Sequence, residues 1–227
     1  MSICIVIPVY NSPYIQEVVA DVLNYGYRVI VVDDGSDEKL SFSQELELIR
    51  HKHNMGKGEA ILSGAKKAKE LGFDAIVTFD GDKQHLSSQI SKLIDVYKDG
   101  SIVIGNRDFE TANVPDSSKF GRKFSNFWIY LETFKHLGDT QSGFRIYPLT
   151  ILDLNIKNRR FDFEIEILAL HSYRGGKIID VNVDCYYPPS EERVTHFDKL
   201  HDNIRLTKAH TKLMIQRYLL LRGFLWE

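Results

Sequence analysis

Short apolar runs rich in Val and Ile alternate with segments of helical periodicity through the first half of the chain. The apolar runs predict strands at 3–9, 28–33, 46–51, 75–80 and 102–105. The periodic segments between them predict helices at 14–23, 58–71 and 88–97. Such alternation is typical of an α/β fold with a mostly parallel, Rossmann-like central sheet, flanking helices and right-handed crossovers.

The regular alternation stops after Arg107. Residues 111–118 are polar with one proline and predict a loop, whereas 119–136 and 162–173 predict helices and 178–183 a late strand. The segment 199–226 predicts a C-terminal helix with six Lys or Arg and one acidic residue. Two interpretations stay open for it: a helix lying on an anionic membrane surface, or one packed on the core or on a second subunit in a homodimer.

Composition narrows the choice of protein class. A chain of 227 residues with 43% hydrophobic residues can bury the core of one large domain. The net charge of -2 gives no global attraction to nucleic acid, so we expect no nucleic-acid partner. Cys4 and Cys185 are far apart and predict reduced thiols in a cytoplasmic setting. No apolar stretch approaches the roughly 20 residues that span a bilayer, so we expect a cytoplasmic protein, with peripheral contact at the inner face of the membrane left open.

Two predicted strands end in paired acids next to a glycine. Asp33 and Asp34 follow one strand, and Asp80 and Asp82 follow another. Because parallel strands open their carboxyl ends on one edge of the sheet, these acids can converge on one ligand. Asp33 could accept hydrogen bonds from a nucleobase or ribose, or could form a turn. Asp80 and Asp82, with Gln84, offer oxygen ligands to Mg²⁺ or Mn²⁺, and the alternative is capping of the next helix.

Further polar candidates lie at turns. The run 54–58 contains two glycines before a predicted helix, where backbone N–H groups can approach phosphate or sugar oxygens. Four arginines near glycine, proline or polar turns could bind phosphate bidentately or could be surface residues: Arg107, Arg122, Arg145 and Arg193. Asp139, in the loop 138–143, is a candidate general base or a turn-forming residue.

Seven motifs in this order resemble family 2 glycosyltransferases with the GT-A fold, near the branch of dolichyl-phosphate mannose synthases and related polyprenyl-phosphate glycosyltransferases. They are Ile7-Pro-Val-Tyr-Asn11, Val32-Asp-Asp-Gly-Ser36, Asn54-Met-Gly-Lys-Gly58, Phe79-Asp-Gly-Asp-Lys-Gln84, Gly105-Asn-Arg107, Asp139-Thr-Gln-Ser-Gly-Phe-Arg145 and Glu192-Arg-Val-Thr-His-Phe197. Single motifs of this kind are weak, but their combined order is specific. This chain departs from the family at Lys83, where relatives usually carry glycine, and at Ser12, where many carry an acid.

The resemblance implies a role for each matched residue. The nucleotide would be held by Pro8, Tyr10, Asp33, Asp34, Lys57, Asp80 and Gly81, and the metal by Asp80, Asp82 and Gln84. The catalytic group would comprise Asp139, Arg107, Arg122 and Arg193, and the acceptor would meet Arg107, Arg122, Ser142 and Arg193. The catalytic domain would span 1–197, followed by a basic amphipathic helix at 198–227.

The reaction implied by the resemblance is inverting transfer of a sugar from a UDP- or GDP-linked donor, with Mg²⁺ or Mn²⁺ as cofactor. The acceptor would be a polyprenyl phosphate, or another lipid or glycan of cell-envelope biosynthesis. Two alternatives remain: a hydroxyl acceptor with Asp139 as base, and a degenerate module that only binds nucleotide sugars. Receiver domains and haloacid dehalogenase phosphatases also carry acidic pairs, but theirs follow the first strand, whereas here a strand ending near Pro8 comes first.

Overall fold

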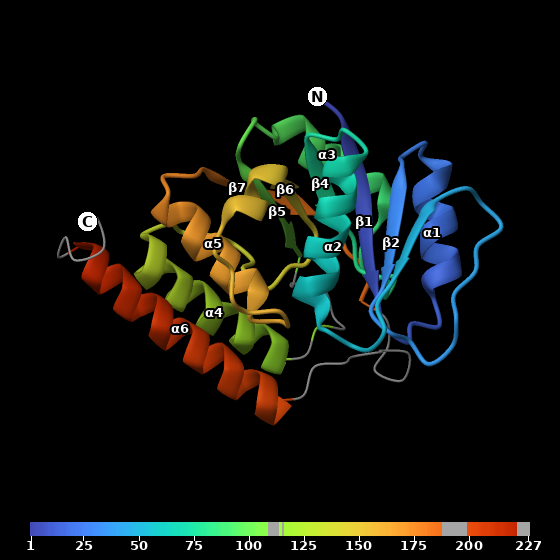
Figure 1. The fold of residues 1–227 in the computed structure, drawn as a ribbon. Coiled ribbons are helices and arrows are strands. Elements are labelled where there is room, and N and C mark those ends of the chain that lie inside the picture. The colour runs from blue at the N-terminus through green and yellow to red at the C-terminus, as the bar shows by residue number, and fades with distance from the viewer. Residues whose placement is uncertain (109–113, 115, 188–198, 222–227) are drawn as a thin grey trace.

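The computed structural model of the chain describes residues 1–108, 114, 116–187 and 199–221 (Figure 1). Within them, seven strands form one mixed sheet in the order β3-β2-β1-β4-β6-β5-β7. The strands are β1 (Ile3–Val9), β2 (Val29–Asp33), β3 (Glu47–Arg50), β4 (Ala75–Thr78), β5 (Ile102–Arg107), β6 (Arg145–Pro148) and β7 (Ile178–Val183). This confirms the predicted α/β class and the mostly parallel sheet.

Only β6 runs against its neighbours. It pairs antiparallel with β4 on one side and β5 on the other, whereas β1, β2, β3 and β4 pair in parallel, as do β5 and β7. Because β6 is antiparallel to both β4 and β5, those two strands point the same way. The carboxyl ends of six strands therefore open on one edge of the sheet.

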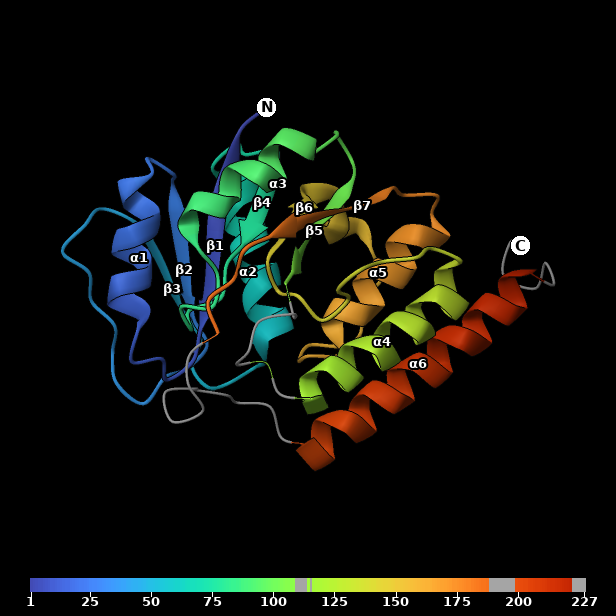
Figure 2. The ribbon, with the colours of Figure 1, turned by 180° about the vertical axis from the view of Figure 1, so that it is seen from behind.

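Helices cover both faces of the sheet (Figures 1 and 2). One face carries α1 (Ile15–Asn24), the short η1 (Ser87–Gln89) and α3 (Ile90–Val96), whose apolar residues pack with Ile5 and Ile7 of β1. The other face carries α2 (Lys57–Glu70), η2 (Leu149–Asp153) and α5 (Phe163–Tyr173). Alternation of side chains along each strand divides the core into these two clusters, one on each face.

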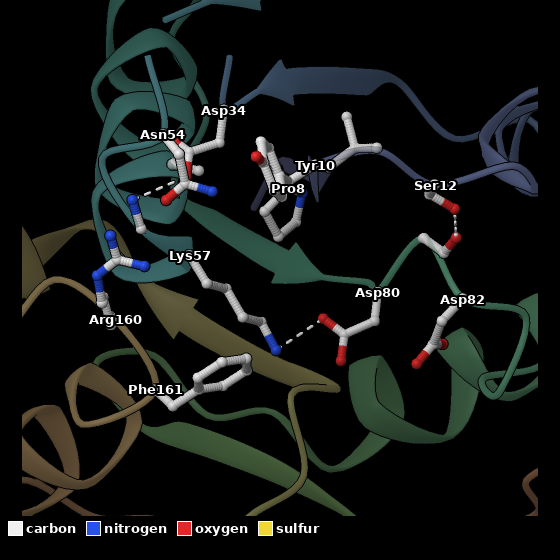
Figure 3. Close-up of a pocket in the computed structure, with 14 residues that line it drawn as sticks. Pro8, Tyr10, Ser12, Asp34, Asn54, Lys57, Asp80, Asp82, Arg160 and Phe161 are labelled. Atoms are coloured by element: carbon white, nitrogen blue, oxygen red, sulfur yellow. Dashed lines mark hydrogen bonds and ion pairs between the residues drawn. The ribbon is translucent and has the colours of Figure 1, made fainter. Parts of the chain in front are cut away.

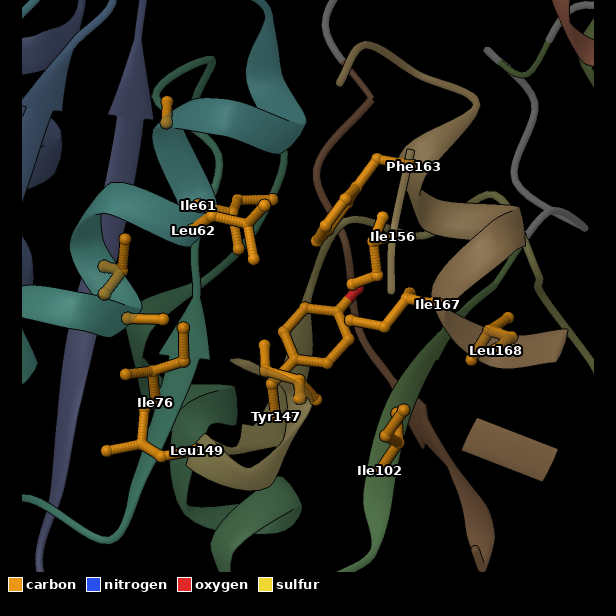
Figure 4. Close-up of a cluster of buried hydrophobic side chains, with 14 of the residues drawn as sticks. Ile61, Leu62, Ile76, Ile102, Tyr147, Leu149, Ile156, Phe163, Ile167 and Leu168 are labelled. Atoms are coloured by element: carbon orange, nitrogen blue, oxygen red, sulfur yellow. The ribbon is translucent and has the colours of Figure 1, made fainter. Parts of the chain in front are cut away.

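The larger cluster joins the two halves of the molecule. Figure 4 shows Tyr147 of β6 between Ile61 of α2 and Ile167 of α5, with Phe163 and Ile156 beside it. All five side chains are at most 5% exposed. Burial of one such large apolar side chain stabilises the fold by about 1.5–3 kcal/mol. The contact therefore holds α5 firmly against the parallel half of the sheet.

Two further helices continue this layer outward. The helix α4 (Asp116–Thr133) packs beside α6 (Lys199–Leu221), and both lie outside α5 (Figures 1 and 2). Buried Ile129 of α4 and Leu213 of α6 join the larger core cluster. Among the described residues, no helix has both the length and the apolar character needed to cross a bilayer.

Two elements differ from the sequence expectation. The helix α4 begins at Asp116, inside the segment 111–118 that was expected to be a loop; of this segment, 111–113 and 115 lie outside the described residues. The strand β6 was not predicted at all. It has only four residues and contains Arg145 and Pro148, so it lacks the apolar run that marks a strand, and the two flanking strands supply its pairing.

The strand order places a crevice between β1 and β4. From β1 the chain moves to β2 and β3 on one side, and then returns to β4 on the other side of β1. In open α/β sheets, ligands bind at the carboxyl ends of the strands where the order reverses in this way. The ends of β1 and β4 carry Pro8 and Asp80, both named as candidates from the sequence.

Candidate active site

A pocket of about 520 Å³ opens at this reversal point (Figure 3). Its walls come from the end of β1, the turns that follow β2 and β4, the start of α2 and the segment before α5. The lining residues are Pro8, Val9, Tyr10, Ser12, Asp34, Asn54, Gly56, Lys57, Ala60, Asp80, Gly81, Asp82, Arg160 and Phe161. Seven of the residues named from sequence therefore meet here: Pro8, Tyr10, Asp34, Lys57, Asp80, Gly81 and Asp82.

Asp34 anchors the glycine turn that precedes α2. Its carboxylate accepts hydrogen bonds from the backbone N–H groups of Met55 (2.9 Å) and Gly56 (2.7 Å), and it lies 2.7 Å from Nδ1 of His51. Gly56 has φ +103°, and a Cβ there would lie 2.4 Å from a backbone oxygen, so the turn requires glycine. Asp34 thus shapes the pocket wall and directs the amino terminus of α2 toward the pocket.

Lys57, the first residue of α2, bridges two acids. Its Nζ lies 2.8 Å from Oδ1 of Asp80 and 2.8 Å from Oε1 of Glu164, which belongs to α5. Burial lowers the pKa of Lys57, but the charges of Asp80 and Glu164 outweigh burial and raise that pKa above its usual range. The ammonium group is therefore charged at neutral pH, and its ionic contact fixes the Asp80 carboxylate in the pocket wall.

The two carboxylates after β4 have opposite environments. For Asp80, burial raises the pKa, but Lys57 and His85 outweigh it and hold the pKa well below the usual range. For Asp82, burial and the adjacent Asp80 charge raise the pKa. Its Oδ1 accepts a hydrogen bond from the backbone N–H of Gln84 at 3.0 Å. Asp82 therefore carries a charge that its protein surroundings compensate poorly.

This donor set suits a divalent cation. Two carboxylates line the same pocket, and hard oxygen ligands are those that Mg²⁺ and Mn²⁺ prefer. A cation beside Asp82 would offset the unfavourable charge that burial imposes on it. No group of three His, Cys, Asp or Glu suited to a metal exists among the described residues, so remaining ligands would have to come from Gln84, water or a phosphate.

Gln84 and Lys83 sit at the rim of this site. The backbone carbonyl of Gln84 accepts a hydrogen bond from Tyr186 N–H at 2.8 Å, and Gln84 is not among the pocket-lining residues. Lys83 has φ +62° and directs its ammonium group to Glu17 of α1, 4.8 Å from the centre of the Tyr14 ring. Its charge thus interacts with α1 and with the Tyr14 ring.

Asp33 is buried in the fold and does not face the pocket lining. Its carboxylate lies 2.5 Å from Nη1 of Arg50 and accepts the Ser36 backbone N–H at 2.8 Å, and it is 1% exposed. Asp33 is not among the lining residues. In this arrangement it braces the turn after β2, which is the turn-forming alternative considered from the sequence.

A second polar group lies at the end of β5. Arg107 pairs with Asp139 through Nε (2.7 Å) and Nη2 (3.1 Å), and Arg122 donates from Nη1 to the Arg107 carbonyl at 3.1 Å. Burial lowers the pKa of Arg107, but the Asp139 charge outweighs it and raises that pKa. Asp139 and Ser142 are fully buried. None of these four residues is among those lining the pocket, and Arg193 lies outside the described residues.

Arg145, another arginine singled out in the sequence, is fully buried in the fold. It donates to the carbonyls of Ser142 (2.6 Å), Thr140 (2.8 Å) and Glu164 (2.8 Å) and to the Tyr147 hydroxyl (3.0 Å). A buried guanidinium needs such a complete set of acceptors. Arg145 therefore ties the loop 138–143 to the first turn of α5, and it is too enclosed to bind phosphate.

Sequence reasoning missed three contributions to the pocket. Arg160 and Phe161 line it, and Glu164 fixes Lys57 from α5. The adjacent arginines at 159 and 160, placed directly before an aromatic residue, were a possible signal. Glu164 carried no such signal, because acids in the first turn of a helix are common for electrostatic reasons alone.

Comparison with known proteins relates the chain to one protein family. A model of the family described as "Glycosyl transferase family 2" matches residues 4–154. The chain is 32% identical over 215 residues to a UDP-N-acetylglucosamine–dolichyl-phosphate N-acetylglucosaminyltransferase of Methanococcus voltae, covering 82% of this chain and 86% of that one. It is 27% identical over 200 residues to a dolichol-phosphate mannosyltransferase of Pyrococcus furiosus, covering 80% of this chain and 55% of that one.

Solved structures confirm the fold. Glucosyl-3-phosphoglycerate synthase from Mycobacterium tuberculosis, in a crystal structure with Mn²⁺, UDP and glucosyl-3-phosphoglycerate, superposes with a TM-score of 0.70. The superposition covers 95% of this chain and 79% of that one, at 16% identity. Such low identity shows a shared fold and nothing finer, and it agrees with the GT-A fold that the motifs imply.

Proposed function

Because the chain belongs to glycosyl transferase family 2, we propose that it transfers a sugar from a nucleoside-diphosphate sugar to a polyprenyl phosphate, with a divalent cation. The observation that carries this proposal is the convergence of Lys57, Asp80 and Asp82 at the reversal point of the sheet. An ammonium group and a two-carboxylate cation site, side by side, suit the diphosphate of a donor sugar. In this proposal the catalytic residues fall within 1–197.

The donor is proposed to enter with its base and ribose against Pro8, Tyr10 and Asp34. Its diphosphate would then lie near Lys57 and the amino terminus of α2, where backbone N–H groups favour anions. Asp80 and Asp82, with Gln84, would hold Mg²⁺ or Mn²⁺. When bound, that cation supplies electrostatic stabilisation of the charge that develops on the departing diphosphate.

The acceptor is proposed to be a lipid phosphate. The relatives from Methanococcus voltae and Pyrococcus furiosus are named for dolichyl-phosphate or dolichol-phosphate substrates, which supports this choice. Phosphate monoesters lose their second proton near pH 6, so the attacking oxygen is already ionised at neutral pH and needs no general base. The bidentate contact of buried Asp139 with Arg107 supports a reaction of this kind, because it leaves no free carboxylate in that loop to act as base.

Arg107, Arg122 and Arg193 remain proposed contacts for the acceptor phosphate, whereas Ser142, expected there from the motifs, is fully buried. The ionic contact between Arg107 and Asp139 orients the guanidinium without removing its charge, and Arg122 lies next to it. Two adjacent guanidinium groups could bind one phosphate. In this view Asp139 positions Arg107 and takes no proton.

A donor screen tests the proposal. Common UDP- and GDP-sugars are each incubated with Mn²⁺, Mg²⁺ or a chelator, with and without a short-chain polyprenyl phosphate, and nucleotide release is followed. We expect release from one donor, stimulated by the lipid phosphate and abolished by the chelator. Asp82→Asn should abolish it, whereas Asp184→Asn, which changes an exposed carboxylate outside the pocket, should not. The proposal is contradicted if no donor binds or if Asp82→Asn leaves nucleotide affinity unchanged.

A further inference from the structure

The helix α4 exposes a stripe of phenylalanines. Phe120, Phe124, Phe127 and Phe134, just after its last turn, are 71%, 47%, 55% and 55% exposed. Spacings of four and three residues put Phe120, Phe124 and Phe127 on one side of α4, and Phe134 follows directly after the helix. We call these four residues the aromatic stripe. A contiguous apolar patch of this kind is rare on a soluble surface and marks an interaction site.

The opposite side of α4 is already occupied. Ile129 is buried in the core, and Glu132 lies 2.7 Å from Nδ1 of His210 on α6. The Trp128 ring stacks on the same histidine at 5.7 Å. Both sides of α4 that pack on the rest of the fold are thus in use, and the described residues show no packing role for the exposed rings of Phe120, Phe124 and Phe127. The Phe134 ring lies 4.9 Å from the Arg217 guanidinium of α6.

Neighbouring rings support one another along the aromatic stripe. Phe120 and Phe124 stack at 6.2 Å, and Trp128 lies 6.1 Å from both Phe124 and Phe127. Lys119 and Lys123 flank the rings on the same helix, and the described acidic side chain of α4, Glu132, is buried against α6. Apolar rings bordered by lysines form the pattern of a helix that lies in a membrane interface.

The adjacent helix α6 extends this character. Ile204, Ile215 and Tyr218 are 45%, 56% and 56% exposed and lie on one side of α6 by their spacing. Lys208 and Lys212 are exposed on the same helix. Both views show α6 running alongside α4 at the outer edge of the molecule (Figures 1 and 2).

We propose that the aromatic stripe of α4 inserts into the interface of an anionic lipid bilayer, with the lysines of α4 and α6 contacting the lipid headgroups. Charge selects this partner over a second copy of the chain, because two copies joined through this face would bring the lysine-rich rims together. The earlier expectation placed membrane contact on the C-terminal helix alone. The exposed rings move the insertion to α4 and leave α6 to supply charge.

This proposal does not depend on the identity of the acceptor. It does bring the membrane near the proposed chemistry, because Arg122 of α4 contacts the Arg107 carbonyl at the end of β5. The helix that carries the aromatic stripe thus also carries a proposed phosphate contact.

Vesicle co-sedimentation, without donor or polyprenyl phosphate, tests the proposal. The full chain is mixed with phosphatidylcholine vesicles that contain or lack phosphatidylglycerol. We expect binding to the anionic vesicles, and a loss on the order of tenfold or more in Phe120→Ser/Phe124→Ser/Phe127→Ser, since interfacial binding scales with buried apolar area. A matched control, Tyr25→Ser/Leu48→Ser/Leu71→Ser, removes three exposed apolar side chains from other elements and should bind like the wild type.

Tryptophan emission provides a second measurement that a purely structural role would not change. Trp128 contacts the aromatic stripe, and Trp226→Phe leaves it as the only tryptophan of the chain. Its emission should shift to the blue on anionic vesicles and should not shift in the triple serine variant. Unchanged vesicle binding by that variant overturns the proposal. The proposal is also overturned if the wild type does not bind vesicles and light scattering shows that it forms a dimer which the triple serine variant does not form.

Discussion

The two acidic strand ends look alike in sequence and differ in the folded protein. After β2, Asp33 pairs with Arg50, and Asp34 accepts two backbone N–H groups beside His51. After β4, Asp82 accepts one backbone N–H, and burial together with Asp80 raises its pKa. Satisfied buried acids stabilise a turn, whereas a poorly compensated carboxylate in a pocket, such as Asp82, marks an incomplete site that a ligand can complete.

Lys57 connects the two regions. It begins α2 directly after the turn that Asp34 holds, and its ammonium group reaches Asp80. Asp34 therefore supports the site after β4 indirectly, because it holds the turn that positions Lys57, and the Lys57 ammonium group neutralises Asp80. Variants of the structural acids after β2 should therefore lose stability, whereas variants of the pocket acids after β4 should lose activity.

The largest expected effect is loss of activity in Asp82→Asn. We expect kcat/KM for nucleotide release to fall by about 10²–10³-fold, the loss typical when one electrostatic contribution to the transition state is removed. Steady-state kinetics measures this. Asp184→Asn serves as the control, and an activity loss of similar size in that variant would break the contrast between pocket and surface acids.

The next effect concerns stability at the other strand end. Asp34→Ala leaves the Met55 and Gly56 N–H groups and His51 without their acceptor, so we expect the free energy of unfolding to fall by about 2–4 kcal/mol. Urea denaturation measures it. Asp82→Ala is the comparison and should fall by less than about 1 kcal/mol. Equal losses at the two sites would show that both acids are structural.

The pH dependence should have opposite signs for Asp80 and Asp82. Asp82 has a raised pKa, so the stability gained by its protonation is full below its ordinary value of 3.8 and is lost as the pH rises through the raised value. Asp80 has a lowered pKa, so its stabilising contribution is present above 3.8 and is lost as the pH falls through the lowered value. At pH 7 without metal, Asp82→Asn should therefore raise the Tm by about 2–4 °C.

Differential scanning fluorimetry at pH values from about 3 to about 8, in steps of about one unit, measures these changes. The Tm advantage of Asp82→Asn should vanish below about pH 4. Asp80→Asn should instead lower the Tm at pH 7, because it leaves Lys57 without one of its two anionic partners. A Tm loss in both variants at pH 7 would contradict the difference between the two environments.

Addition of a divalent metal should distinguish the two strand ends as well. At pH 7, Mn²⁺ is expected to raise the wild-type Tm by about 2–3 °C, as a ligand at a concentration several times its dissociation constant does. The shift should disappear in Asp82→Asn and persist in Asp33→Asn, because Asp33 is buried against Arg50 outside the pocket. If Asp33→Asn loses the shift and Asp82→Asn keeps it, the cation binds at the end of β2 and the proposed site at the end of β4 is wrong.

The smallest effect is expected for Lys83→Gly. Glycine removes the exposed pair with Glu17, which contributes about 0–1 kcal/mol, but it also relieves a left-handed backbone at φ +62°. The lost ion pair and the relieved backbone largely cancel. The folding equilibrium constant and kcat/KM should therefore each change by less than about twofold. A large activity loss measured in the donor assay would mean that the lysine acts on the substrate.

The sequence predicted the regular parts of the fold well. Apolar runs located β1, β2, β4 and β5, because a strand buried on both faces is apolar throughout. Shorter apolar runs located β3 and β7, which are only partly buried. The strand β6 escaped prediction because Arg145 and Pro148 interrupt any such run, and its pairing comes entirely from β4 and β5. Local pattern identifies elements that are apolar by themselves, and it misses those that their neighbours impose.

The candidate site was predicted in a similarly uneven way. Motifs in the chain named Asp80, Asp82 and Lys57, which meet in the pocket. They also named Asp139 and Ser142, which the structure buries beside Arg107 and Arg145. Motif matching reports that a residue has a role but does not separate residues that touch a ligand from those that hold the ones that do.

The sequence by itself determined that acids stand at the ends of two parallel strands, because strand and acid are adjacent along the chain and their placement is local. Only the tertiary structure decided which acids are satisfied. The partners of Asp33, Asp34 and Asp80 come from segments beyond each strand, namely Arg50, His51, the turn before α2 and Lys57. Desolvation and compensating charge depend on these distant contacts, so the difference between a structural acid and a ligand-binding acid arises only on folding.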